Sequence, residues 1–183
     1  VGAGAGATIG KTGGGGAMKG GLGTASIVVP AGADMLIVGA IVAVNAVGDI
    51  IDPSNGAVVA GVRTPDGKGL ADSRRMLRAG GAAPIRAGQN TTIGVVATNA
   101  RLTKAQATKV AQMAHDGLAR AIYPAHTMGD GDAIFALATG AIENNEVSRI
   151  GALAAEVMAE AIVRAAQQAT SIPGYPAARD IQR

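Results

Sequence analysis

Residues 88–98 read GQNTTIGVVAT, and the interpretation of the whole chain depends on this stretch. A polar turn rich in Gly and Asn runs without a linker into two threonines and then into a β-branched, uncharged segment. This pattern predicts a tight turn that feeds a strand buried on both faces. Thr91 would then hold a hydroxyl at the mouth of a buried strand. Two threonines also open strands simply because both favour the β region, so the chemistry of Thr91 needs its own argument.

Thr91 could serve as a nucleophile if the peptide bond between Asn90 and Thr91 were cut. The freed α-amine would have a pKa of ~7.7 to 8.0, so it could take the proton from its own hydroxyl at neutral pH. The same oxygen could make the cut by attacking the Asn90 carbonyl, which shifts the acyl group from nitrogen to oxygen and leaves an ester for water to hydrolyse. Asn90 suits this step because Asn tolerates strained, left-handed backbone. The stretch thus supports two interpretations, a plain strand start and an N-terminal nucleophile.

The composition of the 183 residues favours one domain and excludes several classes of function. The net charge of +3 comes from scattered basic residues with almost no aromatics to stack on bases, so we expect no nucleic-acid partner. The absence of Cys excludes disulfides, thiolate metal sites and a Cys nucleophile, and fits a cytoplasmic protein. The longest apolar run, residues 35–47, is shorter than the ~20 residues that a membrane span needs, so we expect no membrane partner.

The glycine-rich start of the chain contains a misleading motif. Residues 5–12 read AGATIGKT and fit a relaxed phosphate-loop pattern. A phosphate loop needs a helix that begins at its lysine, but Gly13 and its neighbours up to Gly16 follow at once, and each Gly costs a helix about 1 kcal/mol. The sequence therefore disfavours an NTPase. Lys11 is either a solvated loop lysine or a cation beside a reaction centre.

The remaining elements follow from periodicity and capping signals. Strands are predicted at residues 24–30 and 35–47, which could pair as a hairpin, at 57–62, and at 133–139. Helices are predicted at 103–121, where Thr103 and Gln106 form a capping box, and after Ser148. Residues 63–89 are expected to form an exposed loop, a natural place for a chain cut. This order predicts an α+β layered domain.

Four polar side chains are candidates for a structural or a chemical role. Asn45 interrupts a predicted strand near its end, so it is either a satisfied structural amide or an oxyanion donor. Asp130 and Asp132 enter a strand two residues apart and should share one face, which is costly unless a cation or a shared proton lies between them. A metal site there would have too few ligands. His115, at the apolar edge of a helix, is interpreted as structural.

Six segments resemble, in matching order, one family of hydrolases. They are VGAGAGATIGK (1–11), AMKGGLGTAS (17–26), VNAVGD (44–49), NTTIGVVAT (90–98), HDGLAR (115–120) and DGD (130–132). The family is that of the DmpA-like L-aminopeptidase/D-esterases, which includes the nylon-oligomer (6-aminohexanoate oligomer) hydrolases. The resemblance covers nearly the whole chain and implies an α-β-β-α sandwich of the type shared with the ornithine acetyltransferases. It also implies self-cleavage, with residues 1–90 as the C-terminal part of an α chain and residues 91–183 as the β chain.

The resemblance assigns roles to particular residues. Thr91 matches the nucleophile and new N-terminus, Lys11 and Asn45 match the active-site lysine and asparagine, and Asp130 and Asp132 match the acidic pair that orients the nucleophile in the nylon-hydrolase branch. We expect no cofactor and no metal. The expected partners are a small peptide or amide-oligomer substrate and further copies, giving a homo-oligomer of α/β heterodimers. Family members usually carry a long upstream segment with a tyrosine near the oxyanion site, so residues 1–183 are expected to form a single hydrolase domain that lacks this segment.

Three functions remain open from the sequence. The first is an amide hydrolase, acting either as an aminopeptidase or on linear amino-acid oligomers. The second is an acyltransferase of the ornithine acetyltransferase type, which shares the fold and a threonine nucleophile but passes the acyl group to another acceptor. The third is a catalytically silent homologue that forms oligomers.

Overall fold

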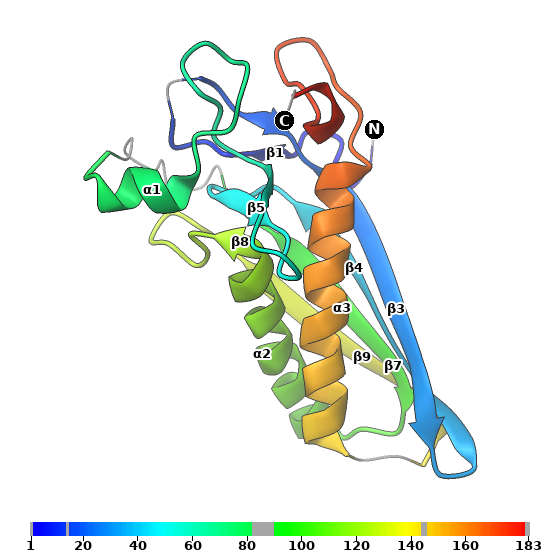
Figure 1. Ribbon diagram of the computed structural model, residues 1–183. Helices are drawn as coiled ribbons and strands as arrows, with labels where there is room; N and C mark the ends of the chain where they lie inside the picture. Colours follow the sequence, from blue (N-terminus) through cyan, green and yellow to red (C-terminus); the bar gives the residue numbers. More distant parts are fainter. Residues whose placement is uncertain (1, 14, 82–89, 144–145, 182–183) are drawn as a thin grey trace.

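The computed structural model describes residues 2–13, 15–81, 90–143 and 146–181, so residues 88 and 89 of the predicted turn lie outside it. It combines strands with two long helices, which confirms the predicted α+β class (Figure 1). The elements are β1 (Thr8–Ile9), β2 (Met18–Lys19), β3 (Gly21–Ala31), β4 (Asp34–Val44), β5 (Asp49–Ile51), β6 (Val58–Ala60), α1 (Ser73–Arg78), β7 (Ile93–Ala100), α2 (Lys104–Ala121), β8 (Ile122–Tyr123), β9 (Ala133–Ile142), α3 (Val147–Gln167) and the 3₁₀ helix η1 (Ala178–Asp180).

A four-stranded sheet with the order β3-β4-β7-β9 forms the centre of the fold. Strands β3 and β4 pair antiparallel as the predicted hairpin. Strand β7 runs antiparallel to β4 and parallel to β9. The strand that begins just after Thr91 is therefore an inner strand with a hydrogen-bonded neighbour on each side.

Helices α2 and α3 cover one face of this sheet (Figure 1). Alternate residues of β4, among them Leu36, Val38 and Val42, are buried beneath them. Small residues allow the close packing that a core almost without aromatics requires, since a Cβ at Gly23 would lie 2.0 Å from the carbonyl oxygen of Ala161 in α3. The layer beside the main sheet is thus built from Ala, Val, Ile, Leu and Met.

The helix boundaries partly match the prediction. Thr103 caps α2, and Gln106 completes the predicted capping box. The prediction that Ser148 caps the last helix is wrong, because α3 begins at Val147 with Glu146 at the N-cap position. Glu146 makes no side-chain cap hydrogen bond there. The start of α3 is therefore set by its apolar stripe rather than by a hydroxyl cap.

The opposite face of the main sheet is apolar and exposed within the described residues. In β7, Gly94 and Val96 face the helices and are buried, whereas Ile93 is 49% exposed. The prediction that this strand is buried on both faces is therefore wrong for this chain, because both helices lie on the same side of the sheet. Eight large apolar side chains line the open face: Leu22, Val28, Met35, Ile37, Ile41, Ile93, Phe135 and Leu137.

Two small sheets, β1-β2 and β6-β5-β8, lie beyond the end of the main sheet at which β7 begins (Figure 1). The segment that follows β6 was expected to be an exposed loop. It is partly ordered instead, with a β-bridge between Arg63 and Leu70 and then helix α1.

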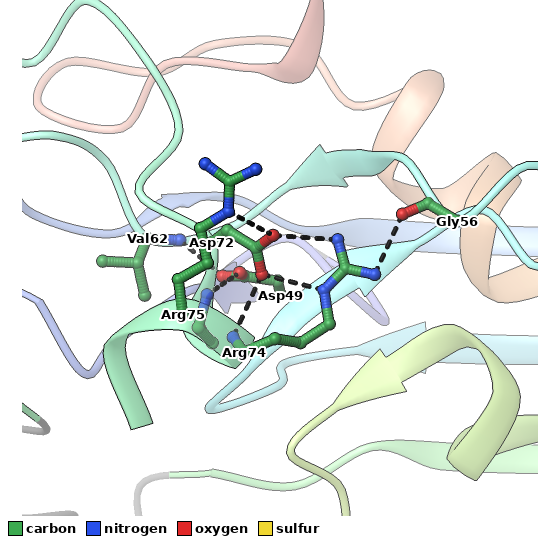
Figure 2. A network of polar contacts seen from close by, with 7 residues as sticks. Asp49, Gly56, Val62, Asp72, Arg74 and Arg75 are labelled. Atoms are coloured by element: carbon green, nitrogen blue, oxygen red, sulfur yellow. Dashed lines mark hydrogen bonds and ion pairs between the residues drawn. The ribbon is translucent and has the colours of Figure 1, made fainter. Parts of the chain in front are cut away.

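A buried carboxylate holds this segment in place (Figure 2). Asp49 is fully buried and accepts hydrogen bonds from the backbone N–H groups of Val62, at 2.7 Å, and Ser73, at 2.6 Å. Asp72 caps α1 from a left-handed backbone conformation and binds the guanidinium of Arg74. The charged cluster therefore ties α1 to the small sheet β6-β5-β8.

Among the described residues, no helix is both long enough and apolar enough to cross a membrane.

Candidate active site

Thr91 lies between the end of β4 and the loop that precedes β9. Its neighbours Asn90 and Thr92 are buried, whereas Thr91 is half-buried. The Thr91 N–H donates to the carbonyl oxygen of Asn45 at 3.2 Å. Asn90 forms a parallel β-bridge with Asp130. Residues 90 and 91 are therefore held on one side by Asn45, which follows β4, and on the other side by the loop that precedes β9.

The Thr91 hydroxyl contacts the peptide group that precedes it. Thr91 Oγ1 donates to the Asn90 carbonyl oxygen at 2.6 Å, and the backbone N–H of Gly131 donates to the same oxygen at 2.9 Å. The carbonyl is thus polarised by two donors. A side chain at residue 131 would disturb this arrangement, because a Cβ there would lie 2.9 Å from Thr91 Oγ1.

Asn45 follows directly after β4 and is oriented by two donors. Its Oδ1 atom accepts from the Thr8 N–H at 3.0 Å and from Lys11 Nζ at 2.8 Å. These donors fix the oxygen side of the amide, so its NH₂ group is turned away from Lys11 and Thr8. Because Asn45 and Thr91 line the same pocket, an orientation of this kind is what an oxyanion donor needs.

Lys11 is connected to Thr91 through the backbone of Asn45. Lys11 Nζ donates to the Asn45 carbonyl oxygen at 2.9 Å, the oxygen that also accepts the Thr91 N–H. Burial lowers the pKa of Lys11 to about 8, and the negative charge of Asp130 opposes this shift. The described residues next to Lys11 form a turn and not a helix, which argues against a phosphate loop. The Lys11 ammonium lies against Asn45, next to the predicted nucleophile.

The two acidic residues lie at the same end of the sheet but have different partners. Asp132 Oδ1 accepts from the Thr92 N–H at 2.8 Å. Asp130 Oδ2 accepts from the N–H of Thr127 at 2.9 Å and from its hydroxyl at 2.8 Å. The hydrogen bonds of these two carboxylates therefore reach the backbone of Thr92 and the side chain of Thr127, whereas the Thr91 hydroxyl donates to the Asn90 carbonyl. A relay from this pair onto Thr91 stays a prediction.

The loop before β9 forms hydrogen bonds with the residues on both sides of Thr91. Gly131 binds the carbonyl of Asn90, Asp132 binds the N–H of Thr92, and the N–H of Ala133 donates to the Thr92 carbonyl at 3.1 Å. Sequence reasoning named Asp132 but missed Gly131, because the contact of a backbone N–H leaves no residue-type signal. The glycine between two aspartates was the one hint available.

A second missed residue is Lys19, which shapes the glycine-rich wall of the site. It is buried, and its Nζ donates to the carbonyl oxygens of Gly20, Gly4 and Ala7 at 2.7, 3.0 and 3.1 Å. Gly4 and Ala7 line the pocket that contains Thr91. A cation bound to three carbonyls thus fixes a segment that has almost no side chains to fix itself.

The pocket at Thr91 has a volume of about 240 Å³. Its lining consists of Gly4, Gly6, Ala7, Ala43, Asn45, Thr91 and Ile93. A larger hollow of about 590 Å³ lies between α2, α3 and the turn after β5, but it shares no residue with this site and contains charges of both signs. The small pocket is the relevant one because it contains the predicted nucleophile. In the part of the chain that the structure describes, no cluster of His, Asp and Glu could hold a metal ion.

The chain is similar to known proteins in sequence and in structure. A model of Peptidase family S58 matches residues 1–179. An uncharacterised aminopeptidase of Mycobacterium leprae is 40% identical over 197 residues, which cover 96% of this chain and 50% of that protein. The 6-aminohexanoate-oligomer endohydrolase of Kocuria sp. is 32% identical over 96 residues, covering 46% of this chain and 27% of that protein.

Among solved structures, a β-aminopeptidase of Burkholderia sp. superimposes with a TM-score of 0.57 and 28% sequence identity. The superposition covers 90% of this chain and 44% of that one. The chain spans about half the length of the curated relatives it matches over most of its sequence.

Proposed function

Because the chain belongs to peptidase family S58, we propose that it carries the reaction centre of a self-processing amide hydrolase with Thr91 as its N-terminal nucleophile. The family membership confirms the resemblance seen in the sequence. The threonine nucleophile, the self-cleavage and the substrate class are the proposal.

One observation carries the proposal: the Thr91 hydroxyl lies against the carbonyl group of the peptide bond that would be cut. In the proposed step, Oγ1 attacks the Asn90 carbonyl carbon, and the hydroxyl proton passes to the departing Thr91 nitrogen. The bond between carbon and nitrogen breaks and an ester remains, which water hydrolyses to the Asn90 carboxylate and the free Thr91 amine. The Gly131 N–H already donates to the carbonyl oxygen that becomes the oxyanion.

In turnover, the free α-amine of Thr91 would act as the general base. It takes the hydroxyl proton while Oγ1 attacks the substrate amide, and it returns the proton to the leaving amine. Asn45 would donate its amide to the oxyanion, and the Lys11 ammonium would stabilise the negative charge nearby. Water then releases the acyl group and restores the enzyme.

For the substrate, we propose short peptides or linear amino-acid oligomers. The pocket of about 240 Å³ suits a small chain end, and the similar proteins are named as aminopeptidases and as a 6-aminohexanoate-oligomer endohydrolase. Release of p-nitroaniline from amino-acid p-nitroanilides, compared with release of 6-aminohexanoate units from its linear oligomer, separates the two substrate classes. Assembly into homo-oligomers of α/β heterodimers stays a prediction.

The intact mass of the full-length protein tests the self-cleavage. We expect two chains, one ending at Asn90 and one beginning at Thr91, with N-terminal sequencing to identify the new end. Thr91→Ala should stay in one piece and be inactive, whereas Thr139→Ala, on an exposed position of β9, should cleave normally. A fully active protein with an unbroken bond between residues 90 and 91 would refute the proposal.

The two alternatives give different products. Transfer of the acyl group to an added amine in preference to water would assign an acyltransferase. Absence of both cleavage and turnover in the full-length protein would assign a silent homologue.

A further inference from the structure

His126 occupies an unusual backbone conformation next to the proposed site. It lies in the loop between β8 and β9 with φ of 54°, in the left-handed region. Among the described residues, Asp72 is the other non-glycine residue with positive φ. Such a conformation costs energy and persists where the surroundings hold the residue in place.

The His126 ring lies between Asp132 and the surface of α2. Its Nδ1 atom is 3.0 Å from Asp132 Oδ2, and its Nε2 atom is 3.4 Å from Nδ1 of His115. The Asp132 side chain is only 6% exposed, and its other oxygen accepts the Thr92 N–H. A continuous chain of contacts thus runs from the residue after the nucleophile, through Asp132 and His126, to His115.

The contact with Asp132 determines which ring nitrogen of a neutral His126 carries the proton. Because Nδ1 of His126 faces a carboxylate, it carries the proton, and Nε2 of the neutral ring is then an acceptor. His115 can fill that acceptor with its own Nδ1–H. In the neutral pair, the Nδ1–H group of each ring therefore faces an acceptor, Asp132 for His126 and the Nε2 atom of His126 for His115.

We propose that His126 is a positioning residue for the reaction at Thr91, acting through Asp132. This inference rests on the proposed function. Asp132 can hold the Thr92 N–H only if its carboxylate stays in one orientation, and a single hydrogen bond to one oxygen leaves the group free to turn about its side-chain torsions. The bond from His126 to the second oxygen removes that freedom. A fixed Asp132 holds the backbone of Thr92, and Gly131 holds the carbonyl of Asn90. The position of the Thr91 side chain follows, because both of its backbone neighbours are fixed.

Loss of the His126 donor should therefore slow the reaction without unfolding the protein. A small misplacement of a reacting group slows a reaction by up to about 100-fold. We therefore expect self-cleavage to be roughly 10- to 100-fold slower without the His126 donor. Asn and Asp both tolerate left-handed backbone and have the same size, but only Asn can donate to Asp132. They form a matched pair of variants.

Self-cleavage of the full-length protein is followed by mass spectrometry for wild type, His126→Asn, His126→Asp and His126→Gly. We expect Asn to recover most of the wild-type rate, Asp and Gly to be slow, and added imidazole to raise the rate of the Gly variant. Asp116→Asn removes an exposed charge beside His115 and should match wild type. Equal rates for His126→Asn and His126→Asp would overturn the proposal, as would a wild-type rate for His126→Gly.

Hydrogen exchange of the Thr92 amide separates this inference from the proposed function. The measurement uses the Thr91→Ala background, in which the chain stays intact. The Thr92 amide should exchange faster in the His126→Asp variant than in the His126→Asn variant. The Ala133 amide, which donates to the Thr92 carbonyl, should exchange at the same rate in both. If wild type fails to cleave but this difference appears, the proposed function fails, whereas the orientation of Asp132 by His126 stands. Equal exchange at Thr92 refutes the positioning role.

Discussion

Among the individual residues of the site, Lys11 has the charge that depends most on its surroundings. Burial lowers its pKa to about 8, so the side chain is a cation at neutral pH and loses its proton as the pH rises through that value. The uncleaved chain has no α-amine at Thr91, and its self-cleavage therefore reports on Lys11 without the overlapping titration of that amine. We expect the ratio of the wild-type rate to the Lys11→Arg rate to fall as the pH rises through about 8, because the guanidinium keeps its charge.

Rates of self-cleavage at a series of pH values provide the measurement. Dividing by the Lys11→Arg rate removes the general effect of hydroxide on the reaction. A ratio that stays constant across this range would show that the charge of Lys11 does not contribute.

Gly131 gives a prediction that depends on space. A Cβ at this position would lie 2.9 Å from Thr91 Oγ1, so Gly131→Ala should displace the hydroxyl from the Asn90 carbonyl. We expect self-cleavage to slow by about 100-fold, as judged by the fraction of intact chain over time. Gly69→Ala is the matched control, because a Cβ there meets only ordinary contacts at 3.5 and 3.6 Å. Normal cleavage of Gly131→Ala would contradict the geometry.

The candidate site was predictable from the sequence where chemistry selects a residue type. The sequence singles out Thr91, Lys11 and Asn45, and the structure connects them through the carbonyl oxygen of Asn45. Gly131 and His126 could not be found in this way. The role of Gly131 depends on the Asn90 carbonyl opposite it, and that of His126 on the side chains of Asp132 and His115. These neighbours are far apart in the sequence and meet only in the folded chain, where β7 pairs with β9.

Among the elements, helix α1 depends on one buried carboxylate. Asp49 accepts from Val62 and from Ser73, the first residue of α1 (Figure 2). Asp49→Ala would leave two donors without this partner, at a cost of about 3 kcal/mol in the free energy of unfolding. Chemical denaturation measures this loss. Asp34→Ala, which removes an exposed carboxylate at the first residue of β4, should leave the midpoint close to wild type.

The pH dependence of the free energy of unfolding tests whether the same carboxylate is buried. Burial raises the pKa of Asp49 above its ordinary value of 3.8, so the folded state binds this proton more readily than the unfolded state. Protonation of the buried carboxyl therefore adds stability below pH 3.8, and this added stability is lost as the pH rises through the raised pKa. Asp49→Ala should lack this slope.

At the level of elements, long periodic segments were predicted and context-dependent ones were not. The β3–β4 hairpin and helix α2 followed from apolar runs and a capping box. Helix α1 was missed because its six residues contain no apolar stripe and it is held by Asp49 from a distant strand. The open face of β7 was missed because its residues are apolar on both sides, so no alternation marks which side is covered.

The molecule as a whole has one covered and one open face of the main sheet. Exposed apolar patches of this extent bind hydrophobic probes. We therefore expect the folded chain of residues 1–183 to enhance the fluorescence of anilinonaphthalene sulfonate. Replacing Phe135 and Leu137, which are 61% and 48% exposed, by Glu should reduce the signal. Met128→Glu, at a fully exposed position in the loop before β9, should not.

The central position of β7 has a further consequence for a protein cut before Thr91. Residues 38–43 of β4 pair with residues 93–98 of β7, and the two strands would then belong to different polypeptides. Unfolding would release two molecules from one, so the melting temperature would rise with protein concentration, whereas that of an uncut chain would not. Refolding would become a bimolecular reaction. Recovery of active protein from the denatured, processed chains would therefore slow on dilution, whereas an uncut chain would refold at a rate independent of its concentration.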